Sequence, residues 1–450
     1  MITQKEVSLK ENAKVFLKVT VPRNEVKREY DDIVQEYCQK AVIKGFRPGK
    51  VPADVLIRKY GEEIKDEAAV TIIKKSLEEA IKDIEEKPLQ QSHPAVSEKV
   101  ELDLEKDFTF EVSYDTFPKV ELGTYKGIRV ERPAVEPGAE DMTRELDAIR
   151  EKNSIVKEKA DAMIARGDIV TVDYAELDAN GQPIEATRRD GFVFEVGKHS
   201  SVYQFDDDLL GAKAGEERTV TKKIPAVAEG AEAAERDVTV KVTVKTVKEK
   251  ILPELNDELA QDVSDKYKTL ADLKTDIEKK LKDSAEERLR EIAATRIVEK
   301  IVESSTIPLP ETMVEVELAQ SWHDLVERFN HNEEMVIRAV QAEGKTKEDV
   351  FKDWRPNAEK KIKSELVIGR VQEVEKIEAT DEDVTAEIKK YAEERGIEYD
   401  KAKEAYEKMN LLDYLKKSVA RQKTIDFLIQ NADVKKGKKV KFLDLLQGNY

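Results

Sequence analysis

Hydrophobic and polar residues alternate in two parts of the N-terminal region, which predicts β-strands within residues 1–22 and 96–112. Between them, apolar positions recur every three or four residues. That spacing predicts helices over residues 24–43 and 53–84, with Asn24 as the expected N-cap of the first helix. The order strand, helix, loop, helix, strand is typical of a compact α+β unit.

The middle of the chain begins with a turn-rich stretch, residues 119–155, in which a helix is expected from about residue 139 to residue 153. Beyond Gly167 the pattern changes to strands and turns, and Asn180-Gly181 favours a hairpin turn because both residues tolerate positive φ. The segments that read as strands are 169–174, 192–196 and 238–245. This region therefore predicts a small β-rich domain of about 90 residues.

After Pro253 the spacing is helical almost to the end of the chain. Thr269 and Asp272 resemble a capping box, with Asp in place of the usual Glu. The expected helices are 269–304, 311–330, 346–376, 380–395, 400–408 and 411–430. The apolar stripes do not keep a strict heptad over several turns, so a long coiled coil is disfavoured.

These patterns predict a multi-domain α+β protein. We expect an N-terminal α+β domain at residues 1–118 and a small β-rich domain at residues 156–248. A large all-α domain should occupy residues 249–450, and the connection at 119–155 should pack with it.

Composition narrows the class of protein. The 450 residues include 95 acidic and 78 basic side chains, a net charge of −17, so the chain is not expected to coat nucleic acid along its length. No apolar run reaches 18 residues, and we expect no membrane association and no secretory signal. Cys38 is the only cysteine, is expected on a helix and partly buried, and fits a reducing cytoplasm.

Common enzyme signatures are mostly absent from the sequence. No Gly-x-Gly occurs, which argues against dinucleotide and kinase loops, and no Ser/His/Asp arrangement is recognisable. A zinc cluster is disfavoured because no two histidines have i, i+4 spacing. The histidines are His93, His199, His323 and His331. We therefore expect neither a metal nor a cofactor.

One segment differs from its acidic surroundings. Residues 40–60 carry six basic side chains against Asp54 alone, a local charge of +5. Phe46 lies there between two glycines, close to Arg47 and Lys50. An exposed aromatic residue among cations is typical of a docking surface for a partly apolar polyanion. The alternative is an ordinary turn between two helices, with Phe46 folded back into the core.

These residues also carry a resemblance to a family. Gly45-Phe46-Arg47-Pro48-Gly49-Lys50-Val51-Pro52 is similar to the ribosome-docking signature of the trigger factor family, bacterial chaperones of nascent chains. Further matches follow in the same order along the chain. They are Gly167–Tyr174, Lys213–Glu217, Leu252–Leu255 and Pro308–Pro310.

The resemblance implies an ATP-independent chaperone that docks beside the ribosome exit tunnel, shields nascent polypeptides and assists folding and export. Its docking segment would contact a large-subunit ribosomal protein and rRNA, and the family suggests a weak homodimer away from the ribosome. The docking residues that it implies are Lys44, Gly45, Phe46, Arg47, Pro48, Gly49 and Lys50.

The β-rich domain resembles peptidyl-prolyl isomerases of the FK506-binding type. The family pocket implies site residues Tyr174, Glu185, Phe192, Val202 and Phe205. Several positions depart from that pattern, and each lost aromatic predicts a shallower pocket. The departures are Ile184 and Val240 for phenylalanine, Gln204 for glycine, Ala175-Glu176 for Thr-Gly, and a segment from Ala226 to Glu235 without tyrosine.

The helical domain would supply the client-binding surface. Candidates along one helix are Met313, Leu318, Trp322 and Phe329, although a stripe at this spacing is also typical of a helix core. Two other readings remain open at this point. One is a free-standing prolyl isomerase with a helical dimerisation domain, and the other is a helical scaffold.

Overall fold

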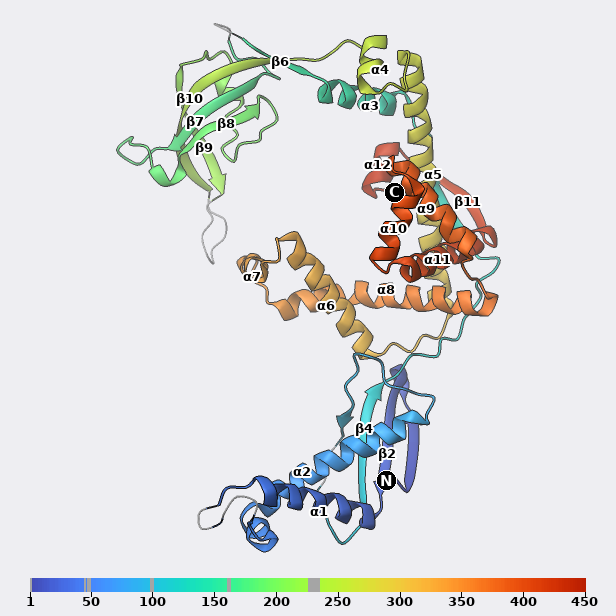
Figure 1. The fold of residues 1–450 in the computed structure, drawn as a ribbon. Coiled ribbons are helices and arrows are strands. Elements are labelled where there is room, and N and C mark those ends of the chain that lie inside the picture. The colour runs from blue at the N-terminus through green and yellow to red at the C-terminus, as the bar shows by residue number, and fades with distance from the viewer. Residues whose placement is uncertain (1, 44–45, 47–49, 98–100, 160–162, 226–234) are drawn as a thin grey trace. The chain divides into compact units, whose positions relative to one another are not determined.

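A computed structural model gives the fold of the chain (Figure 1). The residues that it describes are 2–43, 46, 50–97, 101–159, 163–225 and 235–450. The chain divides into two compact units. The first comprises residues 1–130, 294–341 and 345–434, and the second comprises residues 131–293, 342–344 and 435–450.

The first unit begins with a four-stranded antiparallel sheet in the order β1-β2-β4-β3. Its strands are β1 (Gln4–Leu9), β2 (Lys14–Val21), β3 (Ala95–Val96) and β4 (Phe108–Asp115). Alternate residues of β2, from Val15 to Val21, are fully buried, while their neighbours are exposed or half-buried. The predicted alternation is thus confirmed, because one face of the sheet is covered.

Two helices cover that face, α1 (Arg23–Lys40) and α2 (Ala53–Lys82) (Figure 1). Both predicted helices are confirmed, but the predicted cap is wrong. The helix begins at Arg23 with the extended Pro22 as its N-cap, and Asp107 Oδ1 accepts from the N–H of Arg23 at 2.8 Å in place of a capping side chain. Asn24 therefore lies inside the helix.

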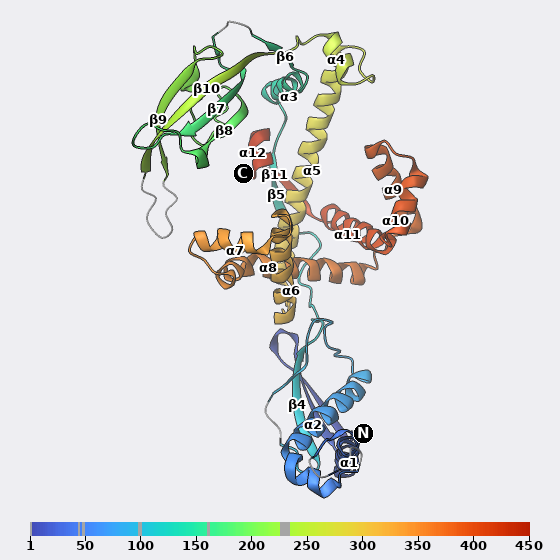
Figure 2. The same cartoon turned by 60° about the vertical axis from the view of Figure 1, so that its left-hand side comes forward.

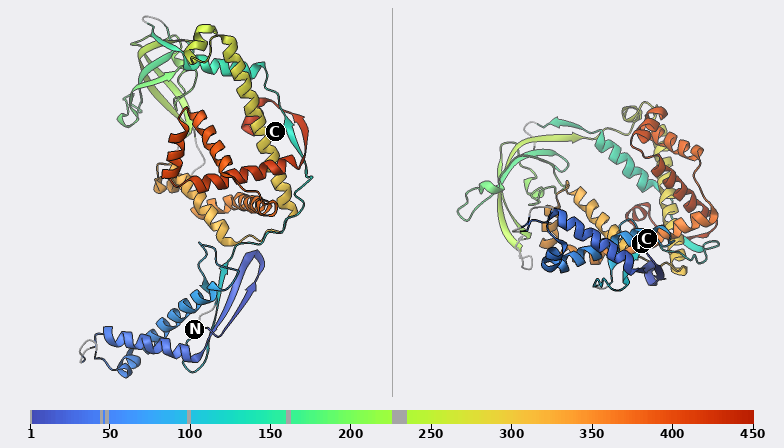
Figure 3. Two further views of the ribbon diagram at one scale, coloured as in Figure 1. Left: turned by 45° about the vertical axis from the view of Figure 1, so that its right-hand side comes forward. Right: turned by 60° about the horizontal axis from the view of Figure 1, so that its bottom comes forward.

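The helical part of the first unit contains two packed groups (Figures 2 and 3). Its elements are α6 (Glu311–Arg328), α7 (Glu333–Ala342), α8 (Lys347–Glu375), α9 (Asp381–Arg395), α10 (Tyr399–Lys408) and α11 (Leu412–Gln430). Helix α6 packs on α8 through Val314, Leu318 and Ala358. Helices α9, α10 and α11 share a separate core.

The second unit holds a five-stranded antiparallel sheet in which β10 pairs with β6, β7 and β9, and β7 also pairs with β8. Its strands are β6 (Ile155–Glu158), β7 (Ile169–Glu176), β8 (Arg189–Glu195), β9 (Glu217–Pro225) and β10 (Glu235–Ile251). Valines of β7 and β10 share one core with Phe194 of β8 and with Phe205 and Leu209 of the loop that follows it. The predicted β-rich domain is therefore present.

Helices α3 (Ala139–Lys152), α4 (Asp257–Val263) and α12 (Phe442–Gln447) complete the second unit around the first half of α5 (Leu270–Ser304). The predicted capping box of α5 is confirmed. The N–H of Thr269 donates to Asp272 Oδ2 at 2.9 Å, and the N–H of Asp272 donates to Thr269 Oγ1 at 3.2 Å.

A two-stranded sheet joins distant parts of the sequence, β5 (Arg129–Ala134) and β11 (Asp433–Lys439). Neither strand was predicted. The sequence of β11 is Asp-Val-Lys-Lys-Gly-Lys-Lys, which has no alternation of apolar and polar residues. Pairing with β5, rather than burial of one face, accounts for its extended form.

Candidate functional sites

The loop between α1 and α2 exposes an aromatic ring above a small core of its own. Ile43, Val51 and Leu56 are buried together at the base of the loop. The N–H of Phe46 donates to the carbonyl of Ile43 at 3.0 Å, yet 39% of Phe46 is exposed and it is not part of that core. Of the two readings of this loop, the structure therefore supports the outward-facing ring.

The other predicted docking residues divide into two groups. Lys50 is exposed at the far end of the loop. Lys44, Gly45, Arg47, Pro48 and Gly49 lie outside the described residues.

In the β-rich domain, a cluster of aromatic rings surrounds Tyr174 at the end of β7. The ring centroid of Tyr174 lies 5.5 Å from that of Phe192 on β8 and 5.4 Å from that of Phe205. Phe194 joins the cluster at 5.6 Å from both Phe192 and Phe205. The structure thus brings together three of the five predicted isomerase residues, in edge-to-face and stacked contacts that favour aromatic packing.

Tyr203 is a member of this cluster that the sequence reading missed. Its ring centroid is 5.6 Å from that of Tyr174, and its hydroxyl donates to Glu176 Oε1 at 2.9 Å. Its position two residues before Phe205, in one short loop, was the available signal. Glu176 is buried at the end of β7, so the hydrogen bond connects that loop to the sheet.

The two remaining predicted residues lie apart from the packed rings. Val202 is 78% exposed, and its N–H has no acceptor among the described residues. Glu185 is exposed on a 3-10 turn, where its carboxylate lies 3.6 Å from Arg188, and it is not part of the ring cluster. Val202 directly precedes Tyr203 and presents a backbone donor, whereas Glu185 presents only a solvated carboxylate.

A buried carboxylate holds the loop that carries Val202. Asp206 is fully buried, and its Oδ2 accepts from the N–H groups of Gly197 and His199, both at 3.0 Å. His199 and Gln204 have φ of 49° and 46°, a region that favours glycine. Gln204 stands where the resemblance led us to expect glycine, so Asp206 stabilises a loop with two strained residues.

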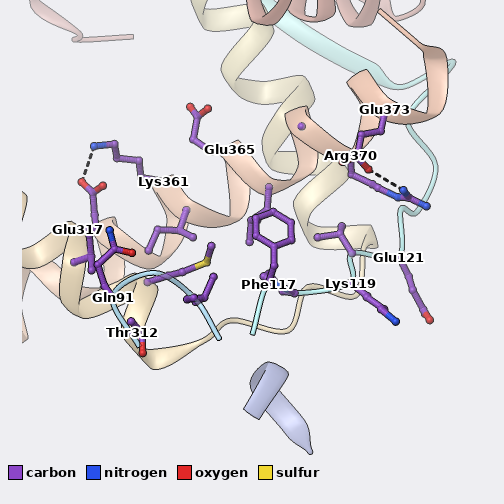
Figure 4. Close-up of a pocket in the computed structure, with 18 residues that line it drawn as sticks. Gln91, Phe117, Lys119, Glu121, Thr312, Glu317, Lys361, Glu365, Arg370 and Glu373 are labelled. Atoms are coloured by element: carbon purple, nitrogen blue, oxygen red, sulfur yellow. Dashed lines mark hydrogen bonds and ion pairs between the residues drawn. The ribbon is translucent and has the colours of Figure 1, made fainter. Parts of the chain in front are cut away.

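An apolar pocket of about 860 Å³ lies within the first unit (Figure 4). Phe117, which is 61% exposed, lines it together with Met313 and Val316 of α6 and Leu366 of α8. Leu89, Val120 and Ile362 add further apolar lining.

Most charged side chains around this pocket are in ion pairs. Lys361 Nζ lies 2.6 Å from Glu317 Oε1, and Arg370 lies 2.9 Å from Glu373 (Figure 4). Two further lining residues pair with residues outside the pocket, Glu365 with Arg421 at 2.6 Å and Lys119 with Glu85 at 3.0 Å. The rim therefore offers little net charge to a ligand.

Two contacts fix the walls of the pocket. Asp115 is buried at the end of β4, and its Oδ2 accepts from the N–H of Thr312 at 2.9 Å and from the Thr312 hydroxyl at 2.8 Å. This carboxylate caps α6, because its own N-cap, Pro310, supplies no side-chain acceptor. On the same helix, Glu311 pairs with Arg355 of α8, and this hydrogen bond holds the pKa of Glu311 below its ordinary value.

The structure corrects two of the predicted client-binding residues. Leu318 and Trp322 are only 3% and 5% exposed, because both face α8 in the helix core. Trp322 Nε1 also donates to Glu333 at 2.8 Å, which helps to hold the pKa of Glu333 below its ordinary value. Phe329 is half-buried beside this core, and of the four candidates only Met313 lines the pocket.

Comparisons with known proteins cover nearly the whole chain. Residues 3–149 match the family model for the bacterial trigger factor protein, and residues 269–430 match the model for its C-terminus. The trigger factor of Treponema denticola is 35% identical over 447 residues, 99% of each chain. The chain belongs to the trigger factor family.

Other comparisons agree with this membership. Residues 160–245 match the model for FKBP-type peptidyl-prolyl cis-trans isomerases. The trigger factor of Borrelia turicatae is 32% identical over 99% of both chains. A solved trigger factor, described under “Promiscuous Substrate Recognition in Folding and Assembly Activities of the Trigger Factor Chaperone”, shares the fold with a TM-score of 0.51 and 23% identity, covering 95% of this chain and 99% of its own.

The chain is therefore a trigger factor-family chaperone with an FKBP-type isomerase domain. Within the described residues, no group of three or more His, Cys, Asp or Glu side chains is arranged to hold a metal ion. The described helices include none that is both long and apolar enough to cross a membrane.

Proposed function

We propose that this chaperone docks on the large ribosomal subunit, beside the exit tunnel, through the loop that carries Phe46. The observation that carries the proposal is the exposed Phe46 on a loop whose base is packed by Ile43, Val51 and Leu56. An anchored base limits the conformational entropy that the loop loses on binding. Phe46 would supply an apolar anchor, and Arg47 and Lys50 would supply the cations for rRNA phosphates.

Co-sedimentation with ribosomes tests this docking site. A variant with Phe46→Ala, Arg47→Ala and Lys50→Ala should bind at least about tenfold more weakly, since each alanine removes either apolar or phosphate contact. Binding of the unaltered chain should also weaken as salt rises. The matched control combines Tyr414→Ala, Lys416→Ala and Lys417→Ala, which removes an exposed aromatic ring and two cations elsewhere. Equal binding by both variants would disprove the docking site.

We further propose that the pocket beneath Phe117 receives apolar stretches of the emerging polypeptide. Its lining combines Phe117 with Met313, whose flexible thioether adapts to side chains of different shapes. A cavity of about 860 Å³ can take several side chains at once. Because most rim charges are already in ion pairs, an uncharged segment would enter without separating them.

For the isomerase domain, we propose that the rings around Tyr174 form one wall of the prolyl site. The barrier to rotation of an X–Pro bond, about 18–20 kcal/mol, comes from the loss of amide resonance. A dry aromatic wall of the half-buried Tyr174 and Phe192, packed against the fully buried Phe205, favours the twisted, less polar amide by excluding water. The free N–H of Val202 is available to hold the carbonyl oxygen of the substrate. No nucleophile is required.

The remaining features of the proposal follow from the family. Divisions near residues 118, 155 and 248 would separate the docking, connecting, isomerase and chaperone segments. The protein would act in the cytoplasm without a cofactor and would contact rRNA together with a ribosomal protein. It would form a weak homodimer away from the ribosome.

A further inference from the structure

A second basic segment lies near the C-terminus, and the docking proposal makes no use of it. The eight residues 434–441 read Val-Lys-Lys-Gly-Lys-Lys-Val-Lys. They contain five lysines and no acidic residue, a local charge of +5 in a chain of −17. The loop around Phe46 spreads the same excess over the 21 residues 40–60. The C-terminal segment is thus the denser concentration of positive charge.

The structure places all five lysines of this segment at the surface. Lys435, Lys436, Lys438 and Lys439 are exposed on β11, and Lys441 is exposed just beyond it. Strand β11 pairs with β5 in a two-stranded sheet, so within the described residues its other edge carries no strand. At about 3.3 Å per residue, the lysines extend along about 20 Å. They form an exposed basic line.

Few carboxylates lie near this basic line, and one of them, Glu131 of β5, lies beside Gly437. Lys439 lies 3.6 Å from Glu136, and both side chains are exposed. For the other four lysines, no ion pair is found among the residues that the structure describes. Lysines elsewhere differ: on α10, Lys403 and Lys408 lie 3.8 Å and 2.7 Å from glutamates one turn away. Unpaired like charges repel one another, and a bound polyanion relieves that repulsion.

We propose that the basic line, residues 434–441, binds the phosphate backbone of RNA without regard to base sequence. Lysine binds phosphate as a point charge, whereas it is depleted from protein–protein interfaces. The segment also lacks an exposed apolar anchor, since Val434, Gly437 and Val440 are half-buried. Without aromatic side chains to stack on bases, it has no means of base recognition. An acidic protein surface is therefore the less favoured occupant.

A salt titration of RNA binding tests the basic line, using the full chain and a fluorescent oligouridylate of about 20 nucleotides. Each phosphate contact with single-stranded RNA contributes about −0.7 to the slope of log K against log salt, so five lysines should contribute about −3.5. Changing all five to glutamine should remove that part of the slope. When all five lysines are present, a fourfold rise in salt concentration should lower the affinity through this contribution by about 100-fold.

Two controls separate this site from net charge and from the docking loop. A variant with equal loss of charge replaces five exposed lysines of α10 and α11 with glutamine, and it should keep the slope. Those lysines are Lys401, Lys403, Lys408, Lys416 and Lys417. The docking variant at Phe46, Arg47 and Lys50 should also retain the contribution of the basic line, so failure of one proposal does not imply failure of the other.

Several outcomes would overturn the proposal. If the slope of log K against log salt falls equally in both lysine variants, the net charge of the protein alone accounts for RNA binding. Loss of RNA binding in the docking variant only would assign the RNA to the loop around Phe46. Tighter binding of polyglutamate than of oligouridylate to the basic line would indicate an acidic protein partner. Circular dichroism should show that the β11 variant is folded; if it is unfolded, single Lys436→Gln and Lys438→Gln variants must each lower the slope by about 0.7.

Discussion

Aromatic residues behave differently in the isomerase domain and in the pocket beneath Phe117. Around Tyr174, the rings of Phe192, Tyr203 and Phe205 lie within 5.6 Å of it, centroid to centroid. Phe117 has no aromatic partner among the described contacts and is mostly exposed. The rings around Tyr174 pack against one another within the protein, whereas Phe117 leaves most of its apolar surface exposed.

This difference fits the two proposed functions, catalysis at a prolyl bond and binding of unfolded chains. A site that acts on one bond needs rings held in fixed positions, because small displacements weaken transition-state contacts. A site that holds many sequences benefits from adaptable side chains and an open mouth. Substitutions in the two regions should therefore affect different properties, stability and turnover in one and client affinity in the other.

The largest effect is expected from Phe205→Ala. Phe205 is fully buried, so its truncation leaves a cavity and should destabilise the isomerase domain by about 3–5 kcal/mol. Denaturant unfolding followed by the fluorescence of tyrosines near the cavity would measure this loss. Phe117→Ala is the matched control and should change stability by less than about 0.5 kcal/mol. A comparable loss in both variants would remove the distinction between the two regions.

Asp206→Ala should have the next largest effect. It leaves the N–H groups of Gly197 and His199 without an acceptor, at a cost of about 1–3 kcal/mol each. The loop carrying Val202 should lose its position, and kcat/KM on a prolyl peptide should fall by at least about tenfold. Asp206→Asn keeps a carbonyl acceptor and should restore most of the activity. Full activity in the alanine variant would show that the carboxylate does not position the loop.

A smaller effect is expected from Phe117→Ala combined with Met313→Ala. Removing both apolar contacts should weaken binding of a fluorescent apolar peptide by about tenfold, while the unfolding midpoint stays the same. Tyr414→Ala, at an equally exposed aromatic outside the pocket, should leave the affinity unchanged. If Tyr414→Ala weakens binding as much, apolar exposure in general, and not the pocket, holds the client.

The smallest effect is expected from lowering the pH, which protonates Glu311. The hydrogen bond from Arg355 lowers the pKa of Glu311 from its ordinary 4.5, so the pair stabilises the packing of α6 on α8 above that pH. This contribution is lost as pH falls below 4.5 and through the lowered value, and peptide affinity should fall with it. The change should be slight because the pair is half exposed. Glu311→Gln should remove this part of the pH profile; an unchanged profile would contradict the assignment.

Much of the fold follows from spacing in the sequence. Alternation in β2 and β10 and the helical spacing of α1, α5 and α8 reflect faces that the structure does bury. The stripe on α6 was harder to interpret, because spacing shows which residues share a face and not what covers it. Leu318 and Trp322 are buried only because α8 returns along that face.

The candidate sites were predictable to different degrees. Family resemblance indicated Tyr174, Phe192 and Phe205, and the structure places them together. The pocket could not be predicted, since Phe117 and Met313 are far apart in sequence. Residues next to them in sequence, Asp115 and Thr312, are joined by two hydrogen bonds, a contact that no local pattern encodes.

The pairing of β5 with β11 has a consequence for the synthesis of the protein itself. About 300 residues separate the two strands, so at about 5–20 residues per second β5 waits roughly 15–60 s for its partner. Throughout that interval its backbone donors and acceptors on that edge stay open to water. A chaperone of newly made chains is, for that time, itself a chain still being made, because β5 cannot pair before β11 is synthesised.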